Sequence, residues 1–247
     1  MMIWLRSLLF QIYFFVSVCI VALVIFVCAL LPYRVRFGIA RSWSRSMLFM
    51  GKAICGLDYV FEGLENIPDR PSVIMIKHTT VFEAYAQMVV FAPQAWVVKR
   101  ELLWIPVFGW GLAAMKPIAI NRGAGHSAVK QVIEKGKARL AEDIWITIFP
   151  EGTRVGRGQT KRYGVSGAAL AKEAQCPVVP VAHNAGELWA RRGLRKTPGL
   201  IRFCVGPAVM PDGKSPKEIN LQVQNWIEAK MREISSAYPA SESSLTV

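Results

Sequence analysis

Residues 8–31 form a run of 24 residues without a charged side chain. A helix of this length, rising about 1.5 Å per residue, would cross the roughly 30 Å of hydrocarbon in a bilayer. A cleaved signal peptide has a shorter apolar region of about 7–15 residues, followed by a cleavage site with small residues. Residues 28–32 offer no such site. We therefore expect a retained membrane anchor.

Basic residues flank this run unevenly. Arg6 alone precedes it, whereas five basic residues follow within the stretch 34–52. By the positive-inside rule, the larger C-terminal part then faces the cytoplasm. Residues 37–54 mix basic and large apolar side chains, as expected of a helix in the headgroup layer. Two geometries fit: one true span, or a helical pair that dips into one leaflet.

The charge of the chain restricts the class of partner. Its 247 residues include 30 Lys and Arg against 17 Asp and Glu, for a net charge of +13. Such an excess predicts contact with an anionic membrane surface or with an acidic substrate or carrier. No nucleic-acid-binding motif is present, so we expect no nucleic-acid partner. Five scattered cysteines, without a C-x-x-C pair, predict neither a metal site nor a disulfide framework.

After residue 71, short β-branched runs alternate with amphipathic segments. Strands are expected at 72–77, 95–99, 117–121, 144–149, 178–182 and 200–205. Helices are expected at 82–91, at 127–142 with Ser127 as N-cap, at 166–175 and at 216–235. This alternation predicts an α/β fold, with a mostly parallel sheet flanked by helices. We divide the chain into an anchor (1–56), one folded domain (57–238) and a disordered tail (239–247).

Three groups of polar residues lie at the ends of these strands, at the sheet edge where α/β folds place their ligands. His78 is followed five residues later by Glu83, whose carboxylate could hold one ring nitrogen while the other faces substrate. Residues 149–154 read Phe-Pro-Glu-Gly-Thr-Arg, in which the arginine offers a fork of donors suited to phosphate. The pair Lys99-Arg100 precedes an apolar stretch, and Arg122 ends another aliphatic run.

In this order and spacing, these groups resemble the glycerolipid acyltransferase family, specifically the 1-acylglycerol-3-phosphate acyltransferases. The family block Phe-Pro-Glu-Gly-Thr-Arg is complete at 149–154, and its Val-Pro-Val strand matches 179–181. Further similarity lies at 99–109 and 118–122, and the resemblance spans about residues 59–210. The family's Asn-His-x-x-x-x-Asp block is matched in part, because Lys77 replaces the asparagine and Glu83 the aspartate.

The resemblance implies acyl transfer from acyl carrier protein or acyl-coenzyme A to the sn-2 hydroxyl of lysophosphatidic acid, giving phosphatidic acid. His78 would be the general base, oriented by Glu83, and no cofactor is implied. Substrate would be held by Lys99, Arg100, Arg122, Glu151, Gly152, Thr153 and Arg154. The glutamate at position 83 leaves open a different lysolipid acceptor, and a non-catalytic lipid-binding membrane protein is the second alternative. His126 and His183 lack an acid partner in a matching pattern and are expected to be structural.

Overall fold

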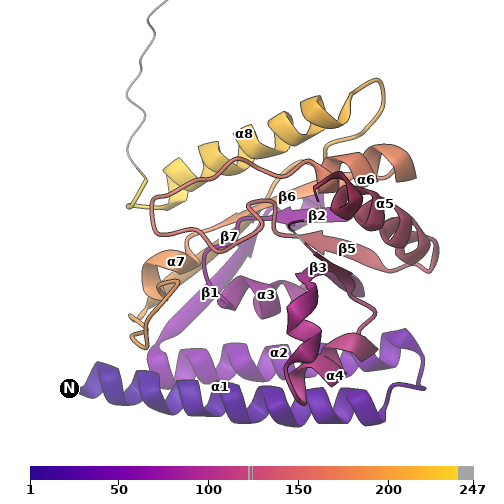
Figure 1. The fold of residues 1–247 in the computed structure, drawn as a ribbon. Helices are drawn as coiled ribbons and strands as arrows, with labels where there is room; N and C mark the ends of the chain where they lie inside the picture. Colours follow the sequence, from indigo (N-terminus) through magenta and orange to yellow (C-terminus); the bar gives the residue numbers. More distant parts are fainter. Residues whose placement is uncertain (122, 124, 239–247) are drawn as a thin grey trace, which may run out of the picture.

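The computed structural model describes residues 1–121, 123 and 125–238, which fold around a seven-stranded sheet (Figure 1). The strand order is β1-β7-β6-β2-β5-β3-β4, and β6–β7 is the antiparallel pairing in an otherwise parallel arrangement. The predicted α/β fold with a mostly parallel sheet is confirmed. The strands are β1 (Leu57–Glu62), β2 (Val73–Ile76), β3 (Gln94–Lys99), β4 (Ile118–Ile120), β5 (Trp145–Ile148), β6 (Val178–His183) and β7 (Gly199–Val205).

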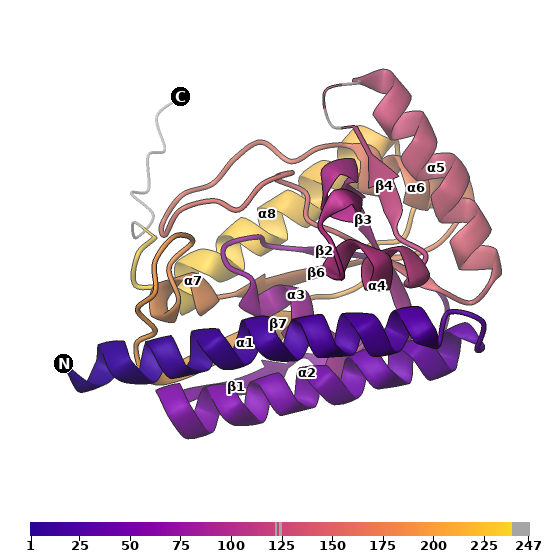
Figure 2. The same cartoon turned by 60° about the horizontal axis from the view of Figure 1, so that its bottom comes forward.

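Helices cover both faces of this sheet (Figure 1). One face carries α5 (His126–Ala141), α6 (Ser166–Ala174) and α8 (Pro216–Ile234). The other carries α2 (Tyr33–Cys55) and α3 (Phe82–Ala86), with α1 (Met2–Val27) as the outermost helix, antiparallel to α2 (Figure 2). The remaining elements are α4 (Phe108–Ala114), α7 (Ala185–Leu188) and the 3-10 helices η1 (Leu64–Asn66), η2 (Gln87–Val89) and η3 (Arg100–Trp104).

Helix α1 corresponds to the uncharged run predicted as an anchor. Among the residues that the structure describes, it is the one helix long and apolar enough to cross a membrane, judged by length and composition. It ends at Val27, before the end of the run, because the chain turns there and Pro32 is already the N-cap of α2. Its inner side bonds to α2: the hydroxyls of Tyr13 and Ser46 pair, and Trp43 Nε1 donates to Ser17 Oγ at 3.0 Å.

The amphipathic helix expected at 37–54 is α2, but several of its basic side chains bond to the protein itself. Arg36 donates to the carbonyl of Ala114, and Arg41 donates to the carbonyls of Met88 and Phe91 at 2.8 and 2.6 Å. The ion pairs Arg34–Asp143 (2.5 Å) and Lys52–Asp58 (2.8 Å) engage two more. These bonds attach helix α2 to the sheet domain. The buried apolar residues of α2 belong to the same hydrophobic core as the sheet.

Several local expectations differ from the structure. Helix α5 begins at His126 with Gly125 at the N-cap, so the assignment of Ser127 as N-cap was wrong. The helix expected at 82–91 divides into α3 and η2, and the sequence patterns did not identify β1, α4 or α7. Helix α8 begins as expected, where Ser215 and Glu218 form a capping box. The expected tail at 239–247 lies outside the described residues.

Close packing of α4 against α1 gives a test of this arrangement. A Cβ on Gly111 would lie 2.5 Å from the Cα and the oxygen of Ala22, whereas a Cβ on Gly38 of α2 would meet no atom within 4 Å. We expect Gly111→Ala to destabilise the fold by about 1–3 kcal/mol through overpacking. Gly38→Ala should stabilise it by about 0.5–1 kcal/mol through helix propensity. Denaturant unfolding in detergent measures both, and equal midpoints for the two variants would contradict the packing.

Candidate active site

The three central strands bring the polar groups together. Strand β2 pairs in parallel with β5 on one side and with β6 on the other, so their carboxyl ends meet at one edge of the sheet. His78 follows β2, and the segment 149–154 follows β5. The backbone N–H of Val155 donates to the carbonyl of His78 at 2.8 Å. The His78 ring also stacks on Phe149, with centroids 3.9 Å apart.

The imidazole of His78 is held by Glu83, which lies in the first turn of α3. Nδ1 of His78 lies 2.8 Å from Glu83 Oε1, and the carboxylate also accepts from the backbone N–H groups of Thr79 and Thr80 and from the Thr80 hydroxyl. Since a carboxylate only accepts hydrogen bonds, Nδ1 carries the proton and Nε2 is the basic nitrogen. The His78 side chain is 16% exposed and Glu83 is fully buried, so the histidine reaches solvent while its partner does not.

The environment of Glu83 favours its ionised form. Burial alone would raise the pKa of this carboxyl, but His183, His78 and the Thr80 hydroxyl lower it to about 2. Because the pKa is depressed on folding, Glu83 stabilises the fold above its ordinary pKa of 4.5, and this contribution is lost as pH falls toward 2. At neutral pH, Glu83 is therefore an anion that can stabilise an imidazolium at His78.

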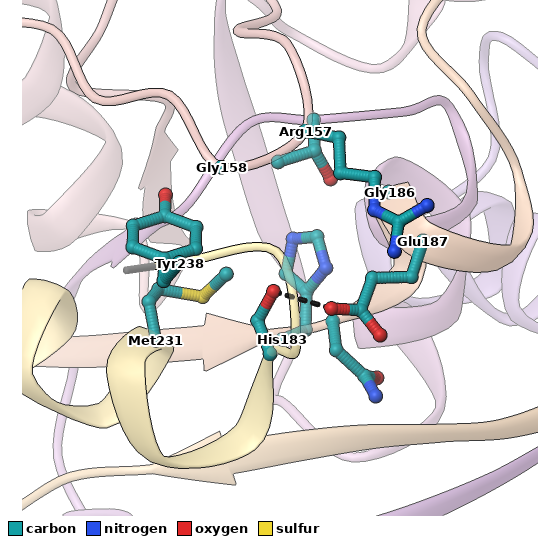
Figure 3. A pocket seen from close by; sticks show the side chains of 10 residues that line it. Arg157, Gly158, His183, Gly186, Glu187, Met231 and Tyr238 are labelled. Atoms are coloured by element: carbon teal, nitrogen blue, oxygen red, sulfur yellow. Dashed lines mark hydrogen bonds between the residues drawn. The ribbon is translucent and has the colours of Figure 1, made fainter. Parts of the chain in front are cut away.

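His183, at the end of β6, is a buried neighbour of this pair, with its Nε2 at 3.9 Å from Glu83 Oε2. Its Nε2 donates to the carbonyl of Lys77 at 2.7 Å, and its Nδ1 accepts from the backbone N–H of Ala185 at 3.3 Å. Burial lowers the pKa of His183, which favours the neutral ring that this bonding requires. Figure 3 shows its ring between Tyr238 and Glu187, in a cavity of about 10 Å³ that holds one water at most. The bonding fits the structural role expected for His183.

The structure divides the segment 149–154 into an inner and an outer part. Glu151 is 3% exposed, and its Oε1 lies 3.3 Å from the Nζ of Lys77 inside the protein. Gly152 has a φ of +67°, a conformation that favours glycine, and turns the chain back to the surface. Thr153 is half-buried and Arg154 is exposed. The guanidinium is therefore available to a ligand, whereas the Glu151 carboxylate faces the interior.

Other residues expected to bind substrate lie farther along the sheet edge. Lys99 ends β3, which is separated from β2 by β5, and Nζ of Lys99 pairs with Glu101 at 3.2 Å. The Arg100 guanidinium lies over the Trp104 ring at 5.7 Å. Arg122 lies outside the described residues. The structure thus joins His78, Glu83 and the segment 149–154, and it places Lys99 and Arg100 at the end of a more distant strand.

Sequence patterns missed two side chains that lie at this site. Arg191 Nη2 donates to Thr153 Oγ1 at 3.5 Å, from a loop whose base is fixed to α1. At that base, Trp189 packs against Phe10 and Lys196 N donates to Ser7 Oγ at 2.9 Å. The second is Glu228 of α8, which bonds to Lys77. Neither residue belongs to a recognisable local pattern; a lysine at the end of a buried strand is the signal that could have pointed to a buried anion beside Lys77.

Comparisons with known proteins show which proteins this chain is similar to. The family model described as Acyltransferase matches residues 58–184. A 1-acyl-sn-glycerol-3-phosphate acyltransferase of Pseudomonas aeruginosa is 41% identical over 214 residues, which cover 85% of this chain and 83% of that protein. The human 1-acyl-sn-glycerol-3-phosphate acyltransferase alpha is 27% identical over 198 residues, covering 78% of this chain and 70% of the human protein.

One solved structure has the same fold. The crystal structure of the 1-acyl-sn-glycerophosphate acyltransferase PlsC from Thermotoga maritima aligns with a TM-score of 0.77, covering 93% of this chain and 94% of the other. The sequence identity is 22%, so this similarity establishes the shared architecture alone.

The geometry predicts distinct effects for changes at the two members of the His78–Glu83 pair. His78→Ala should lower kcat by about 10²–10⁴-fold, because the general base is removed. Glu83→Gln should lower kcat while leaving substrate binding intact, because an amide cannot stabilise imidazolium as a carboxylate does. His126→Ala is the control, since His126 is exposed at the start of α5. Steady-state kinetics on folded protein decides, and appreciable turnover by His78→Ala would refute the assignment.

Proposed function

The chain belongs to the acyltransferase family, and from that premise we propose that it transfers a fatty acyl group from an acyl thioester to the sn-2 hydroxyl of lysophosphatidic acid. The product is phosphatidic acid, for phospholipid biosynthesis. The observation that carries this proposal is the His78–Glu83 pair, bonded at 2.8 Å, beside a loop that exposes Arg154. A base for a hydroxyl and a cation for a phosphate are the two groups that this reaction requires of the acceptor site.

The transfer is direct. Nε2 of His78 takes the proton of the acceptor hydroxyl as that oxygen attacks the thioester carbonyl carbon. A C–O bond forms, the C–S bond breaks, and the imidazolium returns its proton to the leaving sulfur. Glu83 holds the ring and stabilises its positive charge. Buried thiols do not compete as nucleophiles, because burial raises the pKa of Cys176 and of Cys204 to about 11.

Phosphate recognition is assigned to the outer part of the loop. Arg154 offers a guanidinium fork to the acceptor phosphate, with Gly152 and Thr153 beside it. Arg191 reaches the same loop and adds a second cation. Lys99, Arg100 and Arg122 remain assigned to substrate binding by the family resemblance. The thioester donor is acyl carrier protein or acyl-coenzyme A, both of which are acidic and suit a chain with a net charge of +13.

Membrane attachment is assigned to the outer face of α1, with the sheet domain on the cytoplasmic side of an anionic membrane. Large apolar side chains of α1 are exposed, including Leu9, Ile12 and Val16 at 50%, 53% and 54%. The opposite side of the helix packs along α2, α4 and Trp189. Because α1 lies along the body of the protein, a helical pair that dips into one leaflet is favoured over an isolated span.

Acyl transfer by the purified protein to a panel of lysolipids tests the proposed function. We expect turnover with lysophosphatidic acid and much less with lysolipids that carry a larger headgroup. Preference for another lysolipid would support the alternative acceptor, and binding without any turnover would support a non-catalytic lipid-binding protein.

Arg154→Lys should raise the acceptor KM more than the donor KM, because Lys cannot form the bidentate contact. Arg162→Lys, an exposed change farther along the connection between β5 and α6, is the control.

Flotation with anionic liposomes tests the membrane surface. Changing Leu9, Ile12 and Val16 together to Glu should abolish flotation, because the change places charge on the face that enters lipid and leaves the buried side of α1 intact. Leu221→Glu is the control, since Leu221 is 58% exposed on α8, on the opposite face of the sheet (Figure 1). If the triple variant floats as well as the control, the docking surface lies elsewhere.

A further inference from the structure

We propose that Lys77 and Glu228 are positioning residues: together they hold Glu151, and through it the loop that presents Arg154 to the acceptor. Glu151 then acts inside the protein and does not contact substrate. This inference rests on the proposed function, because it explains how the acceptor site of that reaction is kept in place.

The three side chains form one buried cluster. The Lys77 ammonium is fully buried and lies 2.7 Å from Glu228 Oε1 and 3.3 Å from Glu151 Oε1. The Tyr163 hydroxyl donates to the same Glu228 oxygen at 2.8 Å. The ammonium also lies 5.9 Å from the centre of the Tyr163 ring and 5.5 Å from that of Tyr238. One cation thus faces two carboxylates between aromatic rings.

Charge balance makes each member depend on the others. A buried ammonium is costly unless it is paired, and removing one partner of a buried pair leaves an uncompensated charge. Burial raises the pKa of Glu151 to about 7, against the opposing effects of Lys77 and of the backbone N–H groups of Glu151 and His78. Burial therefore opposes ionisation of the Glu151 carboxyl, and the Lys77 ammonium at 3.3 Å favours its ionised form.

The buried cluster links the two parts of the site, His78 and the segment 149–154, from the interior of the protein. Lys77 directly precedes His78, and its carbonyl accepts from His183. Glu151 directly precedes Gly152, where the chain turns outward. The ion pair between the side chains of Lys77 and Glu151 therefore links the backbone at His78 to the backbone of the segment 149–154. Helix α8 stabilises this link by supplying Glu228.

Lysine at position 77 is a departure from the family block, which has asparagine there. A neutral amide would leave Glu151 and Glu228 as two buried carboxylates without a cation, so the lysine and the α8 carboxylate are matched to each other. A direct contact between Glu151 and the acceptor is disfavoured, because the Glu151 side chain is 0% exposed. The exposed hydrogen-bond donors of the loop belong to the residues that follow Glu151.

Titratable and charged groups reach this cluster from each neighbouring element. Lys77 comes from the end of β2, Tyr163 from the segment before α6, Glu228 from α8 and Tyr238 from the segment after α8. Because Lys77 is the cation among these groups and Glu228 an additional anion, their removal should move the titration of Glu151 in opposite directions.

The pH dependence of kcat/KM for the acceptor tests the proposal. Lys77→Met should move the acidic limb of the profile upward by about 1–3 pH units, because an opposite charge at this range lowers a carboxyl pKa by that amount. It should also raise the acceptor KM and leave the donor KM unchanged. Glu228→Gln should move the limb downward, because Glu151 then has Lys77 to itself. Glu233→Gln is the control, since Glu233 forms an exposed ion pair with Lys230 on the same helix.

Opposite shifts of the acidic limb support the proposal. Shifts in the same direction, or no shift beyond that of Glu233→Gln, would overturn it. If Lys77→Met does not fold, the downward shift in Glu228→Gln decides alone. The wild-type enzyme in the same assay distinguishes the two proposals. Absence of acyl transfer by the wild type refutes the proposed function. Normal transfer by the wild type, without the pH shifts in the variants, refutes the positioning role of Lys77 and Glu228.

Discussion

The buried carboxylate of Glu83 is the group on which the rest of the site depends. It accepts hydrogen bonds from His78, from the backbone N–H groups of Thr79 and Thr80 and from the Thr80 hydroxyl, so one anion fixes both the ring and the loop that carries it. A fully buried carboxylate is tolerated only with such compensation. The compensation holds its pKa low, and a permanent anion beside Nδ1 keeps Nε2 basic.

A second set of charged side chains lies on the other face of β2. Consecutive residues at the end of a strand point to opposite faces of the sheet, so Lys77 and His78 diverge. His78 meets Glu83 of α3 on one face, and Lys77 meets Glu228 of α8 on the other. Residues 149–155 contact both sets of charged side chains. The backbone N–H of Val155 donates to the His78 carbonyl, and Glu151 pairs with Lys77. The proposed base, His78, and the proposed phosphate ligand, Arg154, are thus both positioned through contacts with the residues that follow β2.

Much of this arrangement could be predicted from local sequence, and the exceptions have a common cause. His78, Glu83 and the segment 149–154 follow β-branched runs that form buried strands, so their meeting at one sheet edge was predictable. Strand β1 was not, because it is half-buried and pairs with β7, far along the chain. The bond between Lys77 and Glu228 spans 151 positions. Only the folded chain shows such a partner, although a charged residue at the end of a buried strand indicates that one exists.

In the proposed direct transfer, the acceptor hydroxyl is activated by His78 and attacks the thioester without an acyl-enzyme intermediate. Intact-mass spectrometry of the enzyme, quenched after a single turnover with a labelled acyl donor, tests it with and without lysophosphatidic acid. Direct transfer predicts unmodified protein in both samples, labelled phosphatidic acid only when the acceptor is present, and neither product nor modified protein with His78→Ala. A protein-bound acyl group that forms without acceptor and decays when lysophosphatidic acid is added would contradict it.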